Sequence, residues 1–385
     1  MPTPPALQRP LARLLCESVL GLEGPLGEDV VALHGEDVVA AGLEHRVTPA
    51  MERRLRSAPD APERLQRILK LHRHAQLMRH MQASGDLRVV AELLDGAGLG
   101  WIVAKGPVAA DLIWPHPDMR EYYDVDVFVS RRDFAEALRL LQDAGFTLVD
   151  RNWPELLRTM RAEVALRGQA GTHLDLHWDI AVPPSLRRAF RTDMPGMLSR
   201  ADRRSLGSGV TVGVFDPVDT VLHLLFHAAQ AGANKLMWIA DIHHACVAEG
   251  FDWAELERRC RRARIEVPAA LVLERVQRTL GLTVEPPPSV FAPASGPWGR
   301  LARWREARAP FPGLPGDVSL SGIVFSSARP GPVTSVVEAA RATYETRRVE
   351  RLIAKNGPQD RVLYRDVPDP RARERYLDAV TGGAL

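Results

Sequence analysis

The fold of this chain is decided by the stretch Tyr123-Asp124-Val125-Asp126-Val127-Phe128-Val129, in which two aspartates alternate with apolar residues. Side chains of a β-strand alternate between its two faces, so we expect Asp124 and Asp126 on one face and the valines on the other. At ~3.3 Å per residue, the two carboxylates lie roughly 6 to 7 Å apart. The stretch therefore predicts a strand with one acidic face and one apolar face that presses into the core.

A third aspartate, Asp175, follows about fifty residues later in His173-Leu174-Asp175-Leu176-His177-Trp178. If it comes from a neighbouring strand, three anions meet, and each close pair repels by roughly 2 to 3 kcal/mol at an effective dielectric near 20. A divalent cation would relieve that repulsion. The alternative for an isolated Asp-x-Asp is the solvated edge of a half-buried strand.

The segments around the acidic strand favour the first interpretation. An apolar strand over 100–104 ends in Lys105-Gly106 and leads into a small-residue helix. After the acidic strand, residues 130–133 open an amphipathic segment over 134–141, which closes at Gly145. The predicted order is strand, Lys-Gly turn, helix, loop, acidic strand and helix.

With these motifs the chain resembles the uncharacterised branch of the polymerase-β-like nucleotidyltransferase superfamily. The features that carry the resemblance are the Lys-Gly turn, an arginine ahead of the Asp-x-Asp strand, and a later Asp-Leu-His-Trp, which here begin at Lys105, Arg120, Asp124 and Asp175. The likeness runs from about residue 25 to about residue 250. It implies an α+β fold, a nucleotidyltransferase-like mixed sheet with helices, flanked by N- and C-terminal helical regions.

The resemblance also implies roles for individual residues. Asp124 and Asp126 would hold magnesium, and Asp175 would complete the carboxylate set and deprotonate an attacking hydroxyl. Two Mg²⁺ ions about 3.5 to 4 Å apart can clamp the attacking and leaving oxygens of an in-line phosphoryl displacement. Most of the superfamily has Gly-Ser where this chain has Lys105-Gly106. A lysine there can still meet a triphosphate as a point charge, or the change can signal altered chemistry.

Two further residues are candidates for the nucleotide site. Arg120 precedes the acidic strand and could grip a phosphate or pair with Asp124; the alternative is a solvated loop arginine. His177 shares a strand face with Asp175 and could orient it or contact a phosphate. His173 shares that face and ranks lower, and Trp178 points the other way, into the core.

Histidines later in the chain suggest a second metal site, because His223 and His227 are four residues apart on one predicted helix, with Asp241, His243 and His244 close behind. Zinc enzymes with this spacing carry a glutamate beside the first histidine. Here that residue is Leu224. We therefore favour core or interface histidines.

Composition limits the function classes. A formal charge of +2, from 50 basic and 48 acidic residues, does not favour long nucleic acids as partners. The three cysteines have no paired spacing, which is typical of a reducing compartment. No apolar run of eighteen residues and no signal-peptide pattern is present, so we expect a cytoplasmic protein without a membrane segment.

The chain divides by pattern into four regions. Residues 1–98 form an N-terminal helical region, 99–215 the nucleotidyltransferase-like α/β core, and 216–285 a helical domain. Residues 286–385 form a Pro/Gly-rich connection, irregular as far as about residue 335, followed by C-terminal helices over about 336–355 and a polar tail.

The resemblance, together with the acidic cluster, implies a Mg²⁺-dependent nucleotidyltransferase. It would transfer a nucleotidyl group from a nucleoside triphosphate to a hydroxyl or phosphate of a small molecule or modified peptide, and release pyrophosphate. Two alternatives remain open: a non-catalytic module that binds a nucleotide or a partner on the same fold, and a kinase-like phosphotransferase that leaves a nucleoside diphosphate.

Overall fold

The computed structural model of the chain describes residues 9–247, 250–282, 286–308, 311, 321–356 and 362–382. The chain forms two compact units, each assembled from three separate segments. Unit 1 comprises residues 1–78, 109–122 and 217–342, and unit 2 comprises residues 79–108, 123–216 and 343–385. These units cut across the four regions that the sequence pattern predicts, and that division stays a prediction.

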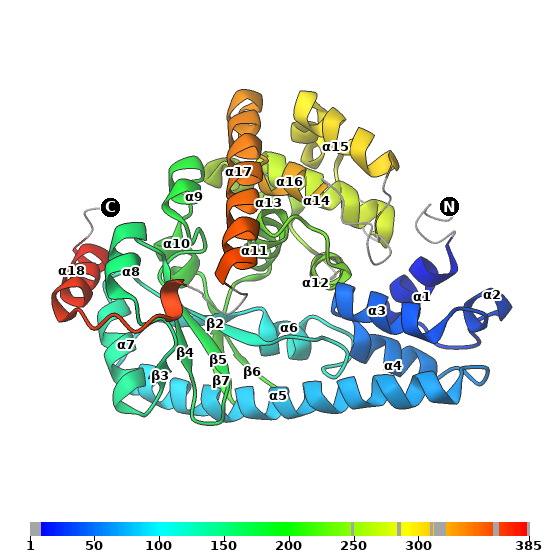
Figure 1. The fold of residues 1–385 in the computed structure, drawn as a ribbon, viewed down its shortest axis with the longest axis horizontal. Coiled ribbons are helices and arrows are strands. Elements are labelled where there is room, and N and C mark those ends of the chain that lie inside the picture. Colours follow the sequence, from blue (N-terminus) through cyan, green and yellow to red (C-terminus); the bar gives the residue numbers. More distant parts are fainter. Residues whose placement is uncertain are drawn as a thin grey trace. The chain divides into compact units, whose positions relative to one another are not determined.

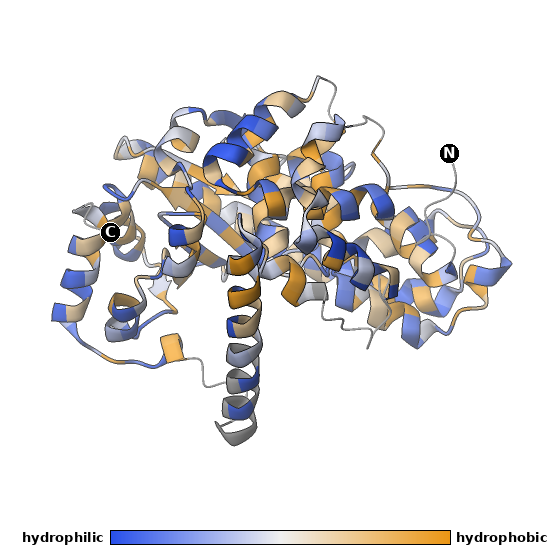
Figure 2. Ribbon diagram, turned by 90° about the horizontal axis from the view of Figure 1, so that it is seen from above, coloured by the Kyte–Doolittle hydropathy of each residue, from blue (hydrophilic) through white to orange (hydrophobic). Residues whose placement is uncertain are grey.

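Unit 2 is built on a five-stranded mixed sheet with the order β1-β2-β5-β4-β3 (Figure 1). β2 runs parallel to β5, whereas the pairs β1–β2, β5–β4 and β4–β3 are antiparallel. The strands span Trp101–Ala104 (β1), Asp124–Val129 (β2), Thr147–Leu148 (β3), Glu163–Arg167 (β4) and His173–His177 (β5). Hydrophobic residues fill much of this sheet (Figure 2).

The acidic strand forms as its alternation predicts. Val125, Val127 and Val129 of β2 are fully buried. Phe128, on the acidic face, is buried as well and stacks on the ring of His177 at 4.6 Å between centroids. Both faces of β2 are therefore covered over most of its length, and Asp126 is buried rather than solvated.

Helices of unit 2 cover and anchor the sheet. α6 (Gly106–Leu112) follows β1 and continues into unit 1, and α7 (Phe134–Asp143) follows β2 as the amphipathic pattern predicts. The C-terminal part of α5 (Glu63–Gly96) carries Asp86, whose carboxylate accepts hydrogen bonds from the backbone N–H groups of Ala170 and Thr172. These bonds hold the turn between β4 and β5. The remaining short helices of unit 2 are α8 (Trp153–Thr159), α9 (Pro184–Ala189) and α10 (Met194–Ser199).

A small hairpin packs against the end of the sheet in unit 2. β6 (Asp202–Ser205) and β7 (Thr211–Val214) are antiparallel, and β7 lies against β1. A Cβ atom on Gly213 would come within 2.0 Å of the carbonyl oxygen of Trp101. Glycine is therefore required for this close approach of two backbones.

The polar tail expected after residue 355 contains a packed helix, so that expectation is corrected here. α18 (Pro370–Thr381) packs against α7 and α8, with Ala372, Tyr376 and Val380 buried. The hydroxyl of Tyr376 donates to the carbonyl of Arg161 at 2.7 Å and accepts a hydrogen bond from the indole Nε1–H of Trp178 at 3.3 Å. The three buried positions lie on one face of α18, at helical spacing within a charged segment.

Unit 1 is helical in its described residues, as the sequence predicts for residues 10–98 and 216–285. Its helices are α1 (Pro10–Val19), α2 (Glu28–Val31), α3 (Gly35–His45), α4 (Thr48–Arg56), the first part of α5, α11 (Pro217–Gln230), α12 (Leu236–Cys246), α13 (Trp253–Ala263), α14 (Glu266–Thr279), α15 (Pro297–Arg308), α16 (Ser321–Ser326) and the first part of α17 (Pro332–Asn356). The prediction of an irregular connection over 286–335 is wrong in part, because this segment contains helices α15 and α16. Two 3₁₀ turns, η2 (Pro288–Val290) and η3 (Ala292–Ser295), precede them. Residues 309, 310 and 312–320 of that segment lie outside the described residues.

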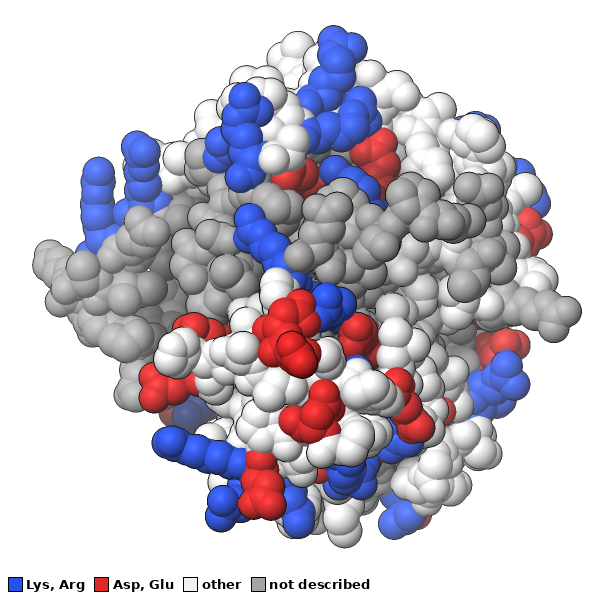
Figure 3. All heavy atoms as spheres, turned by 90° about the vertical axis from the view of Figure 1, so that its right-hand side faces the viewer, with Lys and Arg blue, Asp and Glu red and all other residues white. Residues whose placement is uncertain are grey.

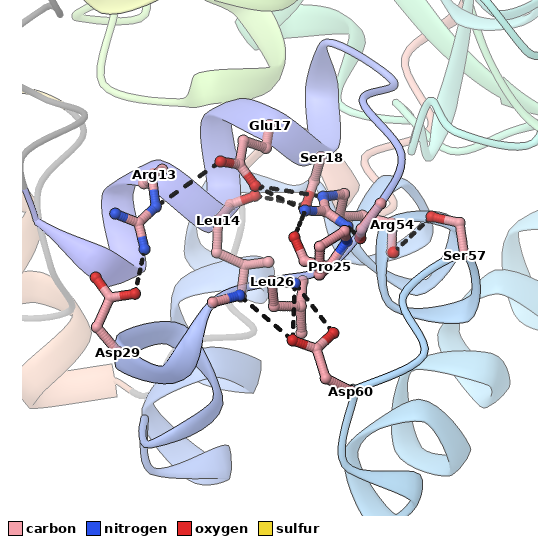
Figure 4. A network of polar contacts seen from close by, with 12 residues as sticks. Arg13, Leu14, Glu17, Ser18, Pro25, Leu26, Asp29, Arg54, Ser57 and Asp60 are labelled. Atoms are coloured by element: carbon pink, nitrogen blue, oxygen red, sulfur yellow. Dashed lines mark hydrogen bonds and ion pairs between the residues drawn. The ribbon is translucent and has the colours of Figure 1, made fainter.

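Polar contacts fasten the N-terminal helices of unit 1 to one another. Figure 4 shows Arg54 of α4 reaching Glu17 of α1 at 3.0 Å and the carbonyl of Pro25 at 3.0 Å. Asp60 accepts hydrogen bonds from the backbone N–H of Leu26. The loop between α1 and α2 is therefore held by charged side chains that follow it in the sequence.

Acidic and basic side chains lie interspersed on the face drawn in Figure 3. Among the described helices, none has the length and apolar character that crossing a bilayer requires. Helix α17 is long, but charged residues recur along its sequence, and it belongs in part to each unit.

Candidate metal centre and cavity

The parallel pairing of β2 with β5 brings the predicted aspartates together in unit 2. Asp126 is the register partner of Asp175, and Asp124 is the register partner of His173. The ligand atoms of Asp126, Asp175 and His177 all lie within 4.8 Å of one another. Asp175 therefore lies beside the acidic strand, as the sequence interpretation requires.

Asp126 is the most enclosed member of this group. It is 5% exposed, with Lys105 Nζ 2.9 Å from its Oδ2 and His177 Nε2 3.1 Å from its Oδ1. Burial by itself would raise the pKa of Asp126, but the charge of Lys105 and the hydrogen bond with His177 hold it well below its usual value. Asp126 is therefore ionised at neutral pH and engaged at both oxygens by residues of the protein.

His177 links Asp126 to a further carboxylate. Its Nδ1 lies 3.4 Å from Oε2 of Glu163, which is the register partner of His177 on β4. Burial would lower the pKa of His177, but the hydrogen bond to Asp126 and the charge of Glu163 raise it. The sequence interpretation had His177 orient Asp175 or contact a phosphate, whereas the structure shows it orienting Asp126.

His173 is the histidine that contacts Asp175. Its Nε2 lies 3.4 Å from Asp175 Oδ1, and this hydrogen bond is the main cause of a raised pKa for His173. The two histidines of β5 thus contact different aspartates, His173 contacting Asp175 and His177 contacting Asp126. His177 belongs to the group with metal-ligand geometry, whereas His173 contacts Asp175 from the cavity side.

A cavity of about 470 Å³ opens beside these strands within unit 2. Four acidic residues line it together with two basic residues, one alanine and a C-terminal segment. These are Asp124, Asp150, Glu163, Asp175, Arg161, His173, Ala165 and 362–364. The C-terminal segment is held by hydrogen bonds from the backbone N–H groups of Arg151 and Asn152 to the carbonyl of Leu363.

Asp150 and Glu163 are cavity residues that the sequence interpretation missed. Asp150 is 3% exposed and its Oδ2 accepts a hydrogen bond from the N–H of Ala165 at 3.0 Å. Burial raises the pKa of Asp150 to about 6. The signal that was available is the alternating segment 163–167 followed by the turn residues Gly168 and Gly171, which predicts a hairpin with the His173 strand.

Arg120 is a buried residue of unit 1. It is 2% exposed, and its Nε and Nη2 lie 2.7 and 2.8 Å from the carboxylate oxygens of Asp241 in α12. The indole of Trp114 donates to the same carboxylate at 2.6 Å. The solvated-loop alternative for Arg120 is wrong, because the side chain is buried. Its Nε and Nη2 groups are engaged by the carboxylate of Asp241, and contact with a phosphate stays a prediction.

Histidines of unit 1 occupy structural positions, in agreement with the favoured interpretation. The Nδ1 of His243 lies 2.8 Å from the carbonyl oxygen of Gly281, and burial lowers the pKa of His243 to about 4. His244 Nε2 lies 2.9 Å from the carbonyl of Val19. His223 is buried, and His227 packs edge-on against Trp238. Among the described residues, the group suited to a metal is the one around Asp126.

The donor set around Asp126 and Asp175 fits a hard divalent cation. Carboxylate oxygens are preferred by Mg²⁺ and Mn²⁺, and an imidazole nitrogen is compatible with Mn²⁺. The hydrogen bond from His177 to Asp126 is the kind of contact that orients a ligating carboxylate. Asp124 lies two residues earlier on the same strand face and lines the cavity with Asp175.

Comparison with known families gives a match over more than half of the chain. A family model described as an uncharacterised nucleotidyltransferase matches residues 34–281, which include both strands of the metal centre and Lys105. The mixed sheet and its helices agree with the α+β fold that the motifs predict. No curated protein matches the chain.

Proposed function

The chain belongs to the uncharacterised nucleotidyltransferase family, and from this we propose that it transfers a nucleotidyl group from a magnesium-bound nucleoside triphosphate to a small acceptor. The observation that carries the proposal is the convergence of Asp126, Asp175 and His177, with ligand atoms within 4.8 Å on adjacent parallel strands.

In the proposed reaction an acceptor oxygen attacks the α-phosphorus of the triphosphate. The new bond joins that oxygen to phosphorus, and the bond from phosphorus to the oxygen that bridges to the β-phosphate breaks, so that pyrophosphate leaves. Asp124, Asp126 and Asp175 would hold a divalent metal ion, which would supply charge stabilisation when bound. Asp175 accepts the proton of the acceptor hydroxyl, and His173 at 3.4 Å orients that carboxylate.

The cavity supports a small acceptor. Its volume of about 470 Å³ is in the range of small-molecule sites, and its walls include Asp124 and Asp175. The walls are polar and hold several charged groups, which suits an acceptor that carries hydroxyl or amino groups. A small molecule or a modified peptide end is the acceptor class that we propose.

Nucleotide binding and product analysis test the proposal. Labelled ATP, GTP, CTP and UTP are titrated against the full chain with and without Mg²⁺, and products are identified in the presence of candidate acceptors. We expect metal-dependent binding of at least one triphosphate and release of pyrophosphate. Binding of none of the four would contradict the proposal, and a nucleoside diphosphate product would identify the kinase-like alternative.

Asp175→Asn is the matched active-site variant, and Asp143→Asn on the exposed face of α7 is its control. We expect Asp175→Asn to lose metal-dependent triphosphate binding by at least tenfold, and Asp143→Asn to keep it. Equal binding by the two variants would favour the non-catalytic module, for which the change from Gly-Ser to Lys105-Gly106 is the supporting feature.

A further inference from the structure

We infer that Lys105 is a built-in cation of the metal centre, which limits the nucleotide-free protein to a single divalent ion. The inference rests on the proposed function, because it concerns the same carboxylates. It limits the expectation of two magnesium ions to the nucleotide-bound protein and gives Lys105 a role other than contact with the triphosphate.

The backbone delivers Lys105 to Asp126. Ala104, the last residue of β1, is the register partner of Asp126, so Lys105 begins the turn beside that carboxylate. Lys105 has a φ of 53°, in the left-handed region, and Gly106 follows with a φ of 42°. Non-glycine residues are uncommon in this region and there cluster at functional sites and at helix ends. Arg46, Met160 and Arg264 adopt it as helix C-caps, whereas Lys105 adopts it between a strand and a helix.

The side chain of Lys105 is held in place by burial and charge. The Lys105 side chain is 12% exposed and the side chain of Asp126, without its backbone, is 7% exposed. Nζ of Lys105 lies 2.9 Å from Oδ2 of Asp126. The other oxygen of Asp126 faces His177 Nε2 at 3.1 Å. An ion that binds Asp126 at Oδ2 therefore has to share that oxygen with a buried ammonium group.

Charge balance then favours one divalent ion. The three carboxylates expected to bind metal, Asp124, Asp126 and Asp175, carry three negative charges, and the ammonium group of Lys105 offsets one, which leaves two on these ligands. The nearby charge of Glu163 is offset separately by its ion pair with Arg161. One divalent cation neutralises the two charges left on the ligands. A second would bring two more positive charges next to the ammonium group in a poorly solvated site, where like charges repel strongly.

Manganese binding to the full chain without nucleotide tests the inference directly. Free Mn²⁺ is followed by electron paramagnetic resonance during titration of the wild type, Lys105→Met and Lys105→Gln. We expect one Mn²⁺ per wild-type chain. We expect a second Mn²⁺, or at least a tenfold lower Kd for the first, in both neutral variants.

Two further variants serve as controls. Lys105→Arg keeps the charge and should bind one Mn²⁺ with a Kd close to that of the wild type. Lys235→Met removes a different partly buried lysine, paired with Glu44 at 2.7 Å in unit 1, and should also bind one. Circular dichroism verifies that each variant is folded.

The outcomes separate this inference from the proposed function. Two Mn²⁺ ions in the wild type, or neutral variants with unchanged stoichiometry and Kd, would refute the role of Lys105 and leave the proposed metal centre standing. No Mn²⁺ bound by the wild type or by any Lys105 variant would refute the metal centre itself, and the inference with it.

Discussion

The ion pair between Lys105 and Asp126 makes a measurable prediction about stability. At 2.9 Å and an effective dielectric near 20, the attraction between the two charges is about 6 kcal/mol before the cost of desolvation. Asp126→Asn removes the carboxylate that lies 2.9 Å from the buried ammonium group of Lys105, and breaking a buried ion pair from one side costs about 3 to 5 kcal/mol. Lys105→Met should cost less, about 1 to 3 kcal/mol, because Asp126 keeps its contact with His177.

The double variant Lys105→Met/Asp126→Asn separates the pair interaction from the effect of each residue. We expect it to be less destabilised than the sum of the single variants by about 2 to 4 kcal/mol, because it removes both charges of the pair together. Urea unfolding at neutral pH with a chelator present, followed by tryptophan fluorescence, measures the free energies of unfolding. Arg139 and Glu136, an exposed pair on α7, form the control cycle, in which no coupling is expected.

Additive effects of Lys105→Met and Asp126→Asn, within about 0.5 kcal/mol, would refute this reasoning. They would mean that the two charges do not interact in solution and that water or an ion separates them. A Lys105→Met variant more stable than the wild type would also contradict the estimate. It would mean that the free-energy cost of backbone strain and desolvation at Lys105, which has a positive φ, exceeds the stabilisation from its ion pair with Asp126.

Three other perturbations have expected outcomes that follow from the structure. Burial raises the pKa of Asp150 to about 6, so the folded state favours the neutral form of this side chain. The free energy of unfolding therefore increases as the pH falls from about 6 towards 4, and this gain is lost as the pH rises through 6. Unfolding at several pH values should therefore show Asp150→Asn gaining about 3 kcal/mol over the wild type between pH 4 and pH 7, and a pH-independent difference would contradict the raised pKa. Gly213→Ala should lower the unfolding free energy by at least about 2 kcal/mol, because its Cβ would meet the Trp101 carbonyl at 2.0 Å; Gly100→Ala, with open space around its Cβ, is the control, and equal melting temperatures would count against this packing. Arg120→Met should destabilise unit 1 by about 3 to 5 kcal/mol in urea unfolding, because Asp241 would be left buried without its cation; a loss below about 1 kcal/mol would contradict the bidentate contact.

The acidic strand and its partner could be predicted from the sequence because strand periodicity is a local property. Alternation over 123–129 placed Asp124 and Asp126 on one face, and the Asp-Leu-His-Trp stretch supplied the third carboxylate. The family match over residues 34–281 confirms the resemblance that those motifs carried. α18 was missed because three buried positions in a charged tail give a weak pattern until the surface that they pack on is known.

Which side chains meet each other was decided only by tertiary structure. The parallel register of β2 and β5 sets Asp126 against Asp175, and the antiparallel register of β4 and β5 sets Glu163 against His177. Arg120, which stands near the acidic strand in the sequence, binds Asp241 more than one hundred residues away. The sequence thus determined which residues carry charge and which strand face they occupy, because these follow from chemistry and backbone geometry along one segment. It left open the choice of partners, because a buried charge is satisfied by whichever opposite group the packing of distant segments brings within a few ångströms.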